Sequence, residues 1–528
     1  MIETRAARAV SSLARLRALP HLPMALLVTF LWLSASNWMR PLALPDEGRY
    51  VGVAWEMLRS GEWLVPSLNG MPYFHKPPLF YWLSAASMSV FGANVWAARL
   101  PSALAATAAA WVLFLFVRRW VDARTGHTAW LVLLTTPLFF AAAQYANHDQ
   151  LVAGLIAVAV LATAHAVLAC EAGLPHRRAL LVAFAAAALA VLSKGLIGAV
   201  LPALVIMAWA VASGRPRALR FIVWWPGWAL FALMAAPWFV AMQLRFATFF
   251  DYFFIQQQFQ RFTGSTDFNN PQPAWFFLQV LALLTLPWFI LIYRVCRPAY
   301  VRDPDRRDVR LLMWVWLLVV LVFFSVPKAK LIGYILPAVV PLAFLLAEGM
   351  LLAVAGRLRG LRIEQWLAVA AGLFCVAAVA SVAWFGNEST RPLAKSLRAQ
   401  MAPTDRVLML DAYIFDAPFY LRLSQPVWLA GAWSAPEIKS LDSWRRELVD
   451  AREFSPQGSA QRMIELDQVA TVLCRPGTTW VFASPDAVTR FPWLGAGKVA
   501  ATASRFQVWR WRSPDDASAP DCLRSAVR

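Results

Sequence analysis

The sequence predicts a polytopic α-helical membrane protein with a C-terminal soluble α/β domain. Three observations support this prediction: the composition, a series of apolar windows of membrane-spanning length, and a change of composition near residue 387. Hydrophobic residues make up 60% of the 528 residues, charged residues only 15%, and the mean hydropathy is +0.53. Soluble globular chains carry about a quarter charged residues. The composition therefore excludes a soluble globule for most of the chain.

Apolar windows of about 20 residues, the length that crosses a bilayer, recur along residues 1–386. They predict about 11 to 13 transmembrane helices and a transmembrane domain over this range. The eleven clearest windows are 22–39, 96–117, 128–145, 149–169, 179–193, 196–212, 221–243, 274–293, 310–326, 332–352 and 364–385.

The connections between these windows alternate in charge. The formal net charge of +19 comes from 49 Lys and Arg against 30 Asp and Glu, and in a soluble protein it would suggest nucleic-acid binding. Here the basic clusters lie in every second connection, as at 118–124, 215–220 and 294–310, which is typical of cytoplasmic loops facing anionic lipid. We therefore expect no nucleic-acid partner, a cytoplasmic N-terminus on a retained first span, and an exported C-terminus. The unusual polar loops then share the outer compartment.

Residues 387–528 have a more polar composition and are long enough for one small domain. Short β-rich runs at 407–410, 479–483 and 506–511 alternate with helix-like stretches at 443–452 and 459–466, which predicts a mixed α/β unit. Cys474 and Cys522 lie in this tail and can pair if it is exported, although the sequence does not show that they do.

The first polar connection, about 40–95, is unusually rich in charge for a segment beside a membrane. Asp46 and Glu47 follow Pro45 and are suited to begin a helix, because carboxylates favour the first turn, and for Glu47 we favour this capping role. Asp46 differs, since Arg49 and Tyr50 follow one helical turn later and share its face. Asp46 is therefore a candidate catalytic carboxylate.

A second candidate acid, Asp149, lies between two windows in QYANHDQ, on the same side of the membrane as Asp46. A lone acid there is equally suited to cap a helix. Its emergence on the same side as Asp46 makes it a catalytic candidate.

Several cations also fall on the outward side, where the positive-inside rule would deplete them. Each alone is explained by a long side chain that reaches to the headgroups. Together they predict a site for an anion such as a lipid phosphate, with Arg as a bidentate clamp and Lys as a point charge. These cations are Lys76 before Pro77 and Pro78, Arg261 in QRF, and Lys328 and Lys330 in SVPKAK, with Tyr334 one turn on.

These motifs together resemble a known family. DEGRY, SGEWLVPSLNGMPYFHKPPLFYW, the loop Asp149, QRF and SVPKAKLIGYILPAVVPLA are similar to the ArnT/PMT-type glycosyltransferases, membrane enzymes of the GT-C fold that take sugar from a polyprenyl phosphate. The resemblance covers residues 22–385, and the tail matches that family's periplasmic domain mainly in position and size. It implies that Asp46 and Asp149 are the two functional loop acids. The residues implied to line the donor-phosphate and sugar pocket are Arg49, Tyr50, Tyr73, Lys76, Arg261 and Tyr334, and we add Lys330 to them.

The resemblance further implies an inverting transfer at the bacterial inner membrane. The expected donor is an undecaprenyl-phosphate-linked sugar, 4-amino-4-deoxy-L-arabinose or another amino sugar, and the expected acceptor is a lipid A phosphate or another lipid. With an anionic phosphate acceptor Asp46 orients the acceptor or the sugar, whereas with a hydroxyl acceptor it becomes the general base. Two alternatives stay open: transfer of hexose or mannose to another lipid or protein acceptor, and transport of a lipid-linked sugar.

We expect no cofactor and no metal site. The chain has no CxxC or Cys/His metal spacing and no Gly-rich phosphate loop. Where the resembling family often carries Glu before the loop lysine and Glu-His before QRF, this chain has His75 and Gln257-Gln258, which leaves a divalent metal without obvious ligands.

Overall fold

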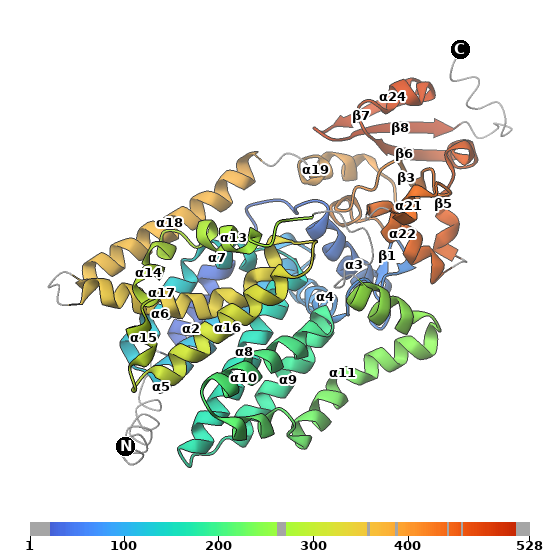
Figure 1. The fold of residues 1–528 in the computed structure, drawn as a ribbon. Helices are drawn as coiled ribbons and strands as arrows, with labels where there is room; N and C mark the ends of the chain where they lie inside the picture. Colours follow the sequence, from blue (N-terminus) through green and yellow to red (C-terminus); the bar gives the residue numbers. More distant parts are fainter. Residues whose placement is uncertain are drawn as a thin grey trace.

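The structure, a computed structural model, describes residues 22–260, 271–355, 360–385, 389–440, 443–455 and 458–513. The predictions on the N-terminal arginines, Arg261 and Cys522 concern residues outside these ranges. Figure 1 shows an elongated body of helices with the sheet-containing C-terminal part packed at one end of it.

The helical body is built from the predicted apolar windows, each of which coincides with a helix or with a broken pair of helices. Within the described ranges, six helices are long and apolar enough to cross a membrane, or up to eight if each bent pair is one span. The prediction of a multi-pass helical membrane protein is confirmed. The elements are α2 (Leu22–Ser34), α5 (Val95–Trp120), α6 (Ala123–Leu134), α7 (Pro137–Ala143), α8 (His148–Glu171), α9 (Arg177–Lys194), α10 (Ile197–Ala212), η1 (Pro216–Phe221), α11 (Trp225–Arg245), the π-helix η2 (Asp251–Gln260), α13 (Phe276–Leu284), η3 (Trp288–Leu291), α14 (Ile292–Val295), α15 (Pro298–Arg302), α16 (Arg307–Ser325), η4 (Ile332–Ala338), α17 (Val339–Val354) and α18 (Gly360–Phe385).

Two of the predicted windows are bent rather than straight. The helix axis turns by 65° between α6 and α7 and by 104° between α13 and the segment Trp288–Val295. Pro137 begins the second helix of the first pair, and Pro287 directly precedes the second helix of the other. Because proline lacks a backbone N–H, it cannot continue the preceding helix but readily begins a new one.

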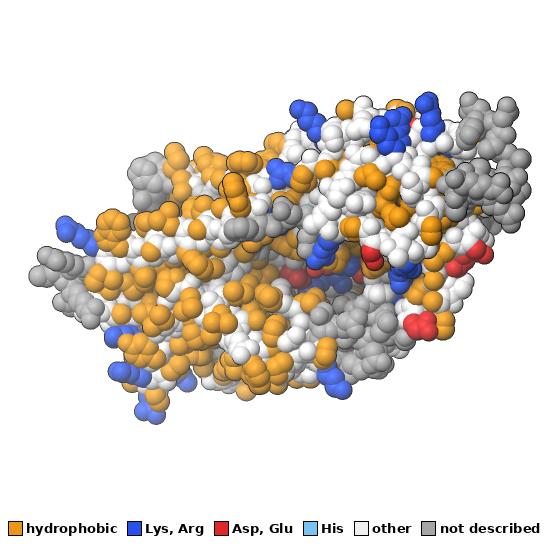
Figure 2. All heavy atoms as spheres, turned by 90° about the horizontal axis from the view of Figure 1, so that it is seen from above, with side chains coloured by type: hydrophobic (Ala, Val, Ile, Leu, Met, Phe, Trp, Pro, Cys, Tyr) orange, Lys and Arg blue, Asp and Glu red, His pale blue; other side chains and the backbone are white. Residues whose placement is uncertain are grey.

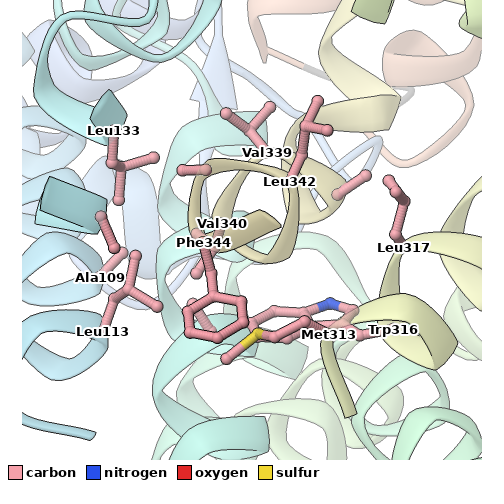
Figure 3. Packing of buried hydrophobic residues seen from close by; sticks show 14 of the residues in the cluster. Ala109, Leu113, Leu133, Met313, Trp316, Leu317, Val339, Val340, Leu342 and Phe344 are labelled. Atoms are coloured by element: carbon pink, nitrogen blue, oxygen red, sulfur yellow. The ribbon is translucent and has the colours of Figure 1, made fainter. Parts of the chain in front are cut away.

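A continuous apolar core holds the helical body together. Figure 3 shows side chains of α5, α6, α16 and α17 meeting in it, among them the fully buried Leu113, Leu133, Trp316 and Phe344. This core fixes the ends of the helices from which the polar loops emerge.

The first polar loop folds into α3 (Asp46–Ser60), a short hairpin of β1 (Ser67–Leu68) and β2 (Met71–Pro72), and α4 (Leu79–Phe91). Asn69 and Gly70 form the hairpin turn, with φ of 53° and 74°, the left-handed conformation that an Asn-Gly turn adopts readily. The buried Glu56 carboxylate accepts both turn N–H groups, at 2.6 and 2.8 Å. The Asn69 amide donates to the Val427 carbonyl at 3.0 Å and accepts from the Val427 N–H at 2.8 Å. The hairpin therefore joins α3 to the C-terminal part.

The C-terminal part contains, within the described residues, a six-stranded sheet of order β5-β4-β3-β6-β8-β7. The strands from β5 to β6 are parallel, and β8 is antiparallel to both β6 and β7. The α/β prediction is confirmed. The elements are α19 (Arg391–Gln400), β3 (Arg406–Leu410), α20 (Ala417–Tyr420), β4 (Trp428–Ala430), α21 (Glu437–Ser440), α22 (Trp444–Glu453), η5 (Gly458–Arg462), β5 (Met463–Ile464), η6 (Leu466–Gln468), α23 (Ala470–Leu473), β6 (Gly477–Ala483), α24 (Ala487–Arg490), η7 (Pro492–Ala496), β7 (Lys498–Thr502) and β8 (Gln507–Ser513).

One local prediction in this part is wrong. Residues 459–466 were expected to be helical, but only the 3₁₀ turn η5 forms there, and Met463 and Ile464 instead pair with Leu429 and Ala430 of β4. Pairing with a strand that is distant in the sequence overrides the local helix pattern.

The first loop and the C-terminal part share one hydrophobic core. Val51 and Phe74 from the loop are buried in it together with Phe415 and Trp480 from the tail. At Gly48 the approach is so close that a Cβ atom would lie 3.0 Å from Phe415 Cβ. This packing carries side chains of the C-terminal part to the start of α3. The domain boundary at residue 387 stays a prediction.

Candidate functional site

A buried arginine links the first loop to the C-terminal part at the start of α3. Arg49 forms ion pairs with Asp46, three residues earlier, and with Glu447 from α22. The Arg49 and Glu447 side chains are only 11% and 10% exposed, whereas that of Asp46 is 47% exposed. Tyr73 Oη donates a hydrogen bond to Glu447 Oε2 at 3.1 Å, and the Tyr50 ring centre lies 5.1 Å from the Arg49 guanidinium carbon. Figure 2 shows acidic and basic side chains gathered in a hollow of the molecule.

The charges of this site act on one another. Partial burial raises the pKa of Asp46 although about half of its side chain still contacts water, and Arg49 opposes this rise. The carboxylates of Asp149 and Glu447 raise the pKa of Asp46 further, and Lys76 lowers it. Arg49, Asp149, Glu447 and Lys76 are therefore all within electrostatic reach of Asp46. Burial acts to raise the pKa of Glu447 too, but Arg49, His75 and the Tyr73 hydrogen bond together outweigh it and the pKa is lowered.

Asp149 stands at the start of α8 but does not cap it. The Asn147 side chain is the cap, because its oxygen accepts the N–H groups of Asp149 at 3.0 Å and of Gln150 at 3.3 Å. The Asp149 carboxylate instead forms an ion pair with Lys194 at the end of α9. The carboxylate partners of Arg49 are Asp46 and Glu447, and Asp149 is not among them.

The Asp149–Lys194 ion pair also contacts η4. Lys194 Nζ lies 4.3 Å from the centre of the Tyr334 ring, a cation–π contact. The neighbouring Gly333 packs directly beneath the Asp149 carboxylate, so that a Cβ atom at this position would overlap Asp149 Oδ2. A residue with a side chain at position 333 would therefore have to displace the Asp149 carboxylate.

One of the predicted cations, Lys330, is bound to backbone carbonyls. Lys330 is 4% exposed, and its Nζ donates to the carbonyls of Gln272 at 3.0 Å and Pro327 at 2.5 Å. Those bonds fasten the loop before η4, and a role of Lys330 in substrate binding stays a prediction. Arg261 lies outside the described residues.

The structural role of Glu47 is larger than the helix-capping role that the sequence predicted. Its carboxylate is completely buried, 2.5 Å from Arg40 Nη1 and 2.7 Å from Arg99 Nη2, and it accepts the N–H groups of Ala43 and Ala146. Burial opposes ionisation, but the two arginines outweigh it and lower the pKa of Glu47 to about 2. The carboxylate joins the start of α3 to α5 and to the turn before α8. Expecting only a cap was wrong, because the sequence does not show that two distant arginines meet there.

Sequence reasoning did not name Glu447, Lys194, Tyr81 or His148 as site residues. The rings of Tyr81 and His148 lie 5.0 Å apart beside Tyr50, and Tyr81 Oη and His148 Nε2 are buried without a hydrogen-bond partner among the residues described. Buried polar atoms are normally bonded, so this wall of the site suits a polar ligand. The Ser-Lys-Gly turn after α9 was a signal for Lys194, whereas nothing in the sequence around Glu447 distinguishes it.

In the part of the chain that the structure describes, no three His, Cys, Asp or Glu side chains form a group that could hold a metal ion. The expectation of a metal-free site stays a prediction.

The fold defines a class of protein. Over 95% of this chain and 100% of the other, the structure superimposes on the crystal structure of ArnT from Cupriavidus metallidurans bound to undecaprenyl phosphate, with a TM-score of 0.79 and 23% sequence identity. The apo form of the same protein gives a TM-score of 0.77. The chain is thus a multi-pass membrane protein of the GT-C fold.

Sequence comparison then gives the relationship. Residues 75–240 match the family described as dolichyl-phosphate-mannose-protein mannosyltransferase. The undecaprenyl phosphate-α-4-amino-4-deoxy-L-arabinose arabinosyl transferase of Aeromonas salmonicida is 33% identical over 65% of this chain and 62% of its own. The protein of the same name from Pseudomonas aeruginosa is 33% identical over 58% of this chain and 56% of its own. The chain is a relative of the ArnT/PMT-type glycosyltransferases, which confirms the resemblance seen in the motifs. It spans between 56 and 66% of the length of these curated relatives.

Proposed function

We propose that the protein is an inverting glycosyltransferase. It moves a sugar, 4-amino-4-deoxy-L-arabinose or another amino sugar, from undecaprenyl phosphate to a phosphate of lipid A. The observation that carries the proposal is the meeting of Asp46, Arg49, Lys76 and Asp149 with Glu447 in one charged site beside the helical body. The names of the relatives supply the donor and the sugar.

The cations of the site suit the phosphate of the donor. The reaction breaks the bond between the anomeric carbon and the phosphate oxygen, and the electron pair of that bond stays on the leaving phosphate. In this proposal Lys76, which acts on Asp46, and Lys194, which pairs with Asp149, stabilise this growing negative charge, as preorganised electrostatic groups do. Lys194 is then shared between Asp149, Tyr334 and the phosphate.

The carboxylates suit the sugar and the acceptor. An acceptor oxygen attacks the anomeric carbon from the face opposite the leaving phosphate, which inverts the configuration. A phosphate acceptor is already anionic and needs no strong base, so Asp46 orients the acceptor or supports positive charge on the sugar ring. Asp46 is the more exposed partner of its ion pair, which leaves its carboxylate accessible to a substrate.

Arg49 has a positioning role in this proposal. Glu447 binds it from the C-terminal part, Asp46 binds its guanidinium from the first loop, and the Tyr73 hydroxyl of the same loop donates to Glu447. The contact between the first loop and the C-terminal part at Arg49 thereby fixes the position of the Asp46 carboxylate. The C-terminal part is then a component of the site, and the proposed compartment is the periplasmic face of the inner membrane, with the N-terminus cytoplasmic and the C-terminus periplasmic.

The test is mass spectrometry of lipid A from cells with and without the gene. Aminoarabinose transfer adds the mass of one amino sugar to a lipid A phosphate only when the gene is present. Lipid A of identical mass in both strains defeats the proposed acceptor.

A second candidate is transfer of mannose or another hexose from a polyprenyl phosphate, which the family match over residues 75–240 favours. Purified protein supplied in turn with undecaprenyl-phosphate aminoarabinose and a polyprenyl-phosphate hexose separates the two. Turnover of the hexose donor alone would support the second candidate.

A further inference from the structure

A basic cavity of about 370 Å³ lies apart from the charged site, where the end of α2 and the start of α5 meet the C-terminal part. Its walls come from the segment after α2, the start of α5, and the helices α19 and α20 with the residues that follow. It has four cationic side chains, Arg391, Lys395, Arg398 and Arg422, and no carboxylate among its lining residues.

Three of these cations share one face of a helix. Arg391, Lys395 and Arg398 are spaced four and three residues apart on α19, which places them on the same side. Arg391 Nη1 donates to the Met39 carbonyl at 3.0 Å, so this arginine is held by the segment after α2. Lys395 and Arg398 are exposed and make no hydrogen bond or ion pair with any described residue.

Arg422 completes the cavity from the opposite wall. It donates to the Ala93 carbonyl, and its guanidinium lies 5.2 Å from the Trp55 ring centre and 5.9 Å from that of Phe419. Its neighbours are thus a carbonyl and aromatic rings rather than a carboxylate. The charge of Arg398 adds to burial in lowering the pKa of Arg422, so the two guanidinium groups repel each other. An anion between them would relieve that repulsion.

The cavity lies where two apolar helices end. α2 ends at Ser34, shortly before Trp38, and α5, which is long and apolar enough to cross a membrane, begins at Val95. Trp38, which is 58% exposed, and Trp96 line it, and tryptophan favours the membrane–water interface. A second cavity of about 340 Å³ shares Arg398 and Arg422 and extends away from the helices. The two cavities together form a groove that is apolar on one side and strongly cationic on the other.

We propose that this cavity binds the phosphate-bearing headgroup of an anionic membrane lipid. The lipid phosphate lies between Lys395, Arg398 and Arg422, and the aromatic side chains of Trp38 and Trp96 contact the first part of the acyl chains. Arg supplies bidentate hydrogen bonds to phosphate and Lys a point charge. The site lies beside α20 and does not include the carboxylates of the charged site, so it binds lipid whether or not sugar transfer takes place.

The test is native mass spectrometry of the full chain, delipidated in detergent and titrated with phosphatidylglycerol, phosphatidylcholine or glycerol 1-phosphate. We compare the wild type with Lys395→Gln/Arg398→Gln, whose side chains are exposed and make no bonds that folding needs. A charge-matched control is Lys498→Gln/Arg512→Gln on the exposed sides of β7 and β8. Each cation near an anionic lipid contributes about 1 kcal/mol, so removal of two weakens binding of phosphatidylglycerol about 30-fold.

The expected result is binding of phosphatidylglycerol over phosphatidylcholine by the wild type and the control, loss in the glutamine double variant, and retention in Lys395→Arg/Arg398→Lys. Equal binding of both lipids by the wild type, or unchanged binding by the glutamine double variant, overturns the proposal. Glycerol 1-phosphate bound as tightly as phosphatidylglycerol overturns the assignment to a lipid and leaves a site for free phosphate.

Discussion

Replacing Glu447 with glutamine tests whether the C-terminal part completes the site. Glu447 accepts hydrogen bonds from Arg49 and from Tyr73 Oη, and the side chains of Arg49 and Glu447 are at most 11% exposed. Glutamine keeps the shape but removes the charge. A hydrogen bond to a charged group contributes about 1.5–3 kcal/mol, so full dependence of transfer on this bond predicts a fall in kcat/KM of roughly 10- to 150-fold.

The assay is transfer by purified protein in proteoliposomes, with Asp467→Asn as a matched control. Asp467 lies on the exposed side of η6 in the same part of the chain. We expect Asp467→Asn to keep wild-type activity. Because Glu447 acts through Arg49, the variants Glu447→Gln and Arg49→Gln combined should lose little more than Arg49→Gln alone. Two results would refute the reasoning. One is activity of Glu447→Gln within twofold of the wild type, and the other is a combined variant whose loss of activity, expressed as free energy, equals the sum of the two single losses.

Three other substitutions test separate parts of the account. Lys76→Ala should lower kcat about 100-fold or more by removing a cation from the leaving phosphate, while the protein still inserts in the membrane; near-normal turnover excludes Lys76 from the site. Gly333→Ala should displace the Asp149 carboxylate and reduce transfer, whereas Gly495→Ala, where an added Cβ meets open space, should not; equal activity of the two contradicts the packing described. Glu47→Gln should lower the free energy of unfolding by about 3–5 kcal/mol, because Arg40 and Arg99 stay buried without their partner; an unchanged melting temperature in detergent would speak against this.

The Glu47 carboxylate also makes the stability of the fold depend on pH. Its pKa in the folded protein is about 2, below the ordinary glutamate value of 4.5, so its ionised form stabilises the fold. This contribution is complete above pH 4.5 and is lost as the pH falls through 2. Wild-type melting temperatures should therefore drop between pH 4.5 and pH 2 by more than those of Glu47→Gln, and parallel curves would contradict the assignment.

The fold was largely predictable because its signals are local. A span needs only a run of apolar residues, and the windows were accordingly found at the right places. The strand at Met463 was not found, since it depends on pairing with β4, which is distant in the sequence. The bends at Pro137 and Pro287 were not predicted either, because a run of apolar residues does not itself show where the helix axis turns.

The site was predictable where its residues share a short segment. Asp46, Arg49 and Tyr50 lie within one turn of α3, so helical spacing alone places them together. Glu447 is 398 residues from Arg49 in the chain, and only the shared core of the first loop and the tail brings them into contact. Lys194 reaches Asp149 because α8 and α9 pack side by side, which spacing does not encode.

The most direct test of the central proposal is the activity of Asp46→Asn. Purified wild-type protein and the variant are reconstituted with undecaprenyl-phosphate aminoarabinose and lipid A, and the lipid A products are weighed by mass spectrometry. The account predicts lipid A carrying one added amino sugar with the wild type and at least about 100-fold less product with the variant. Wild-type amounts of product from Asp46→Asn would contradict a reaction centred on this carboxylate.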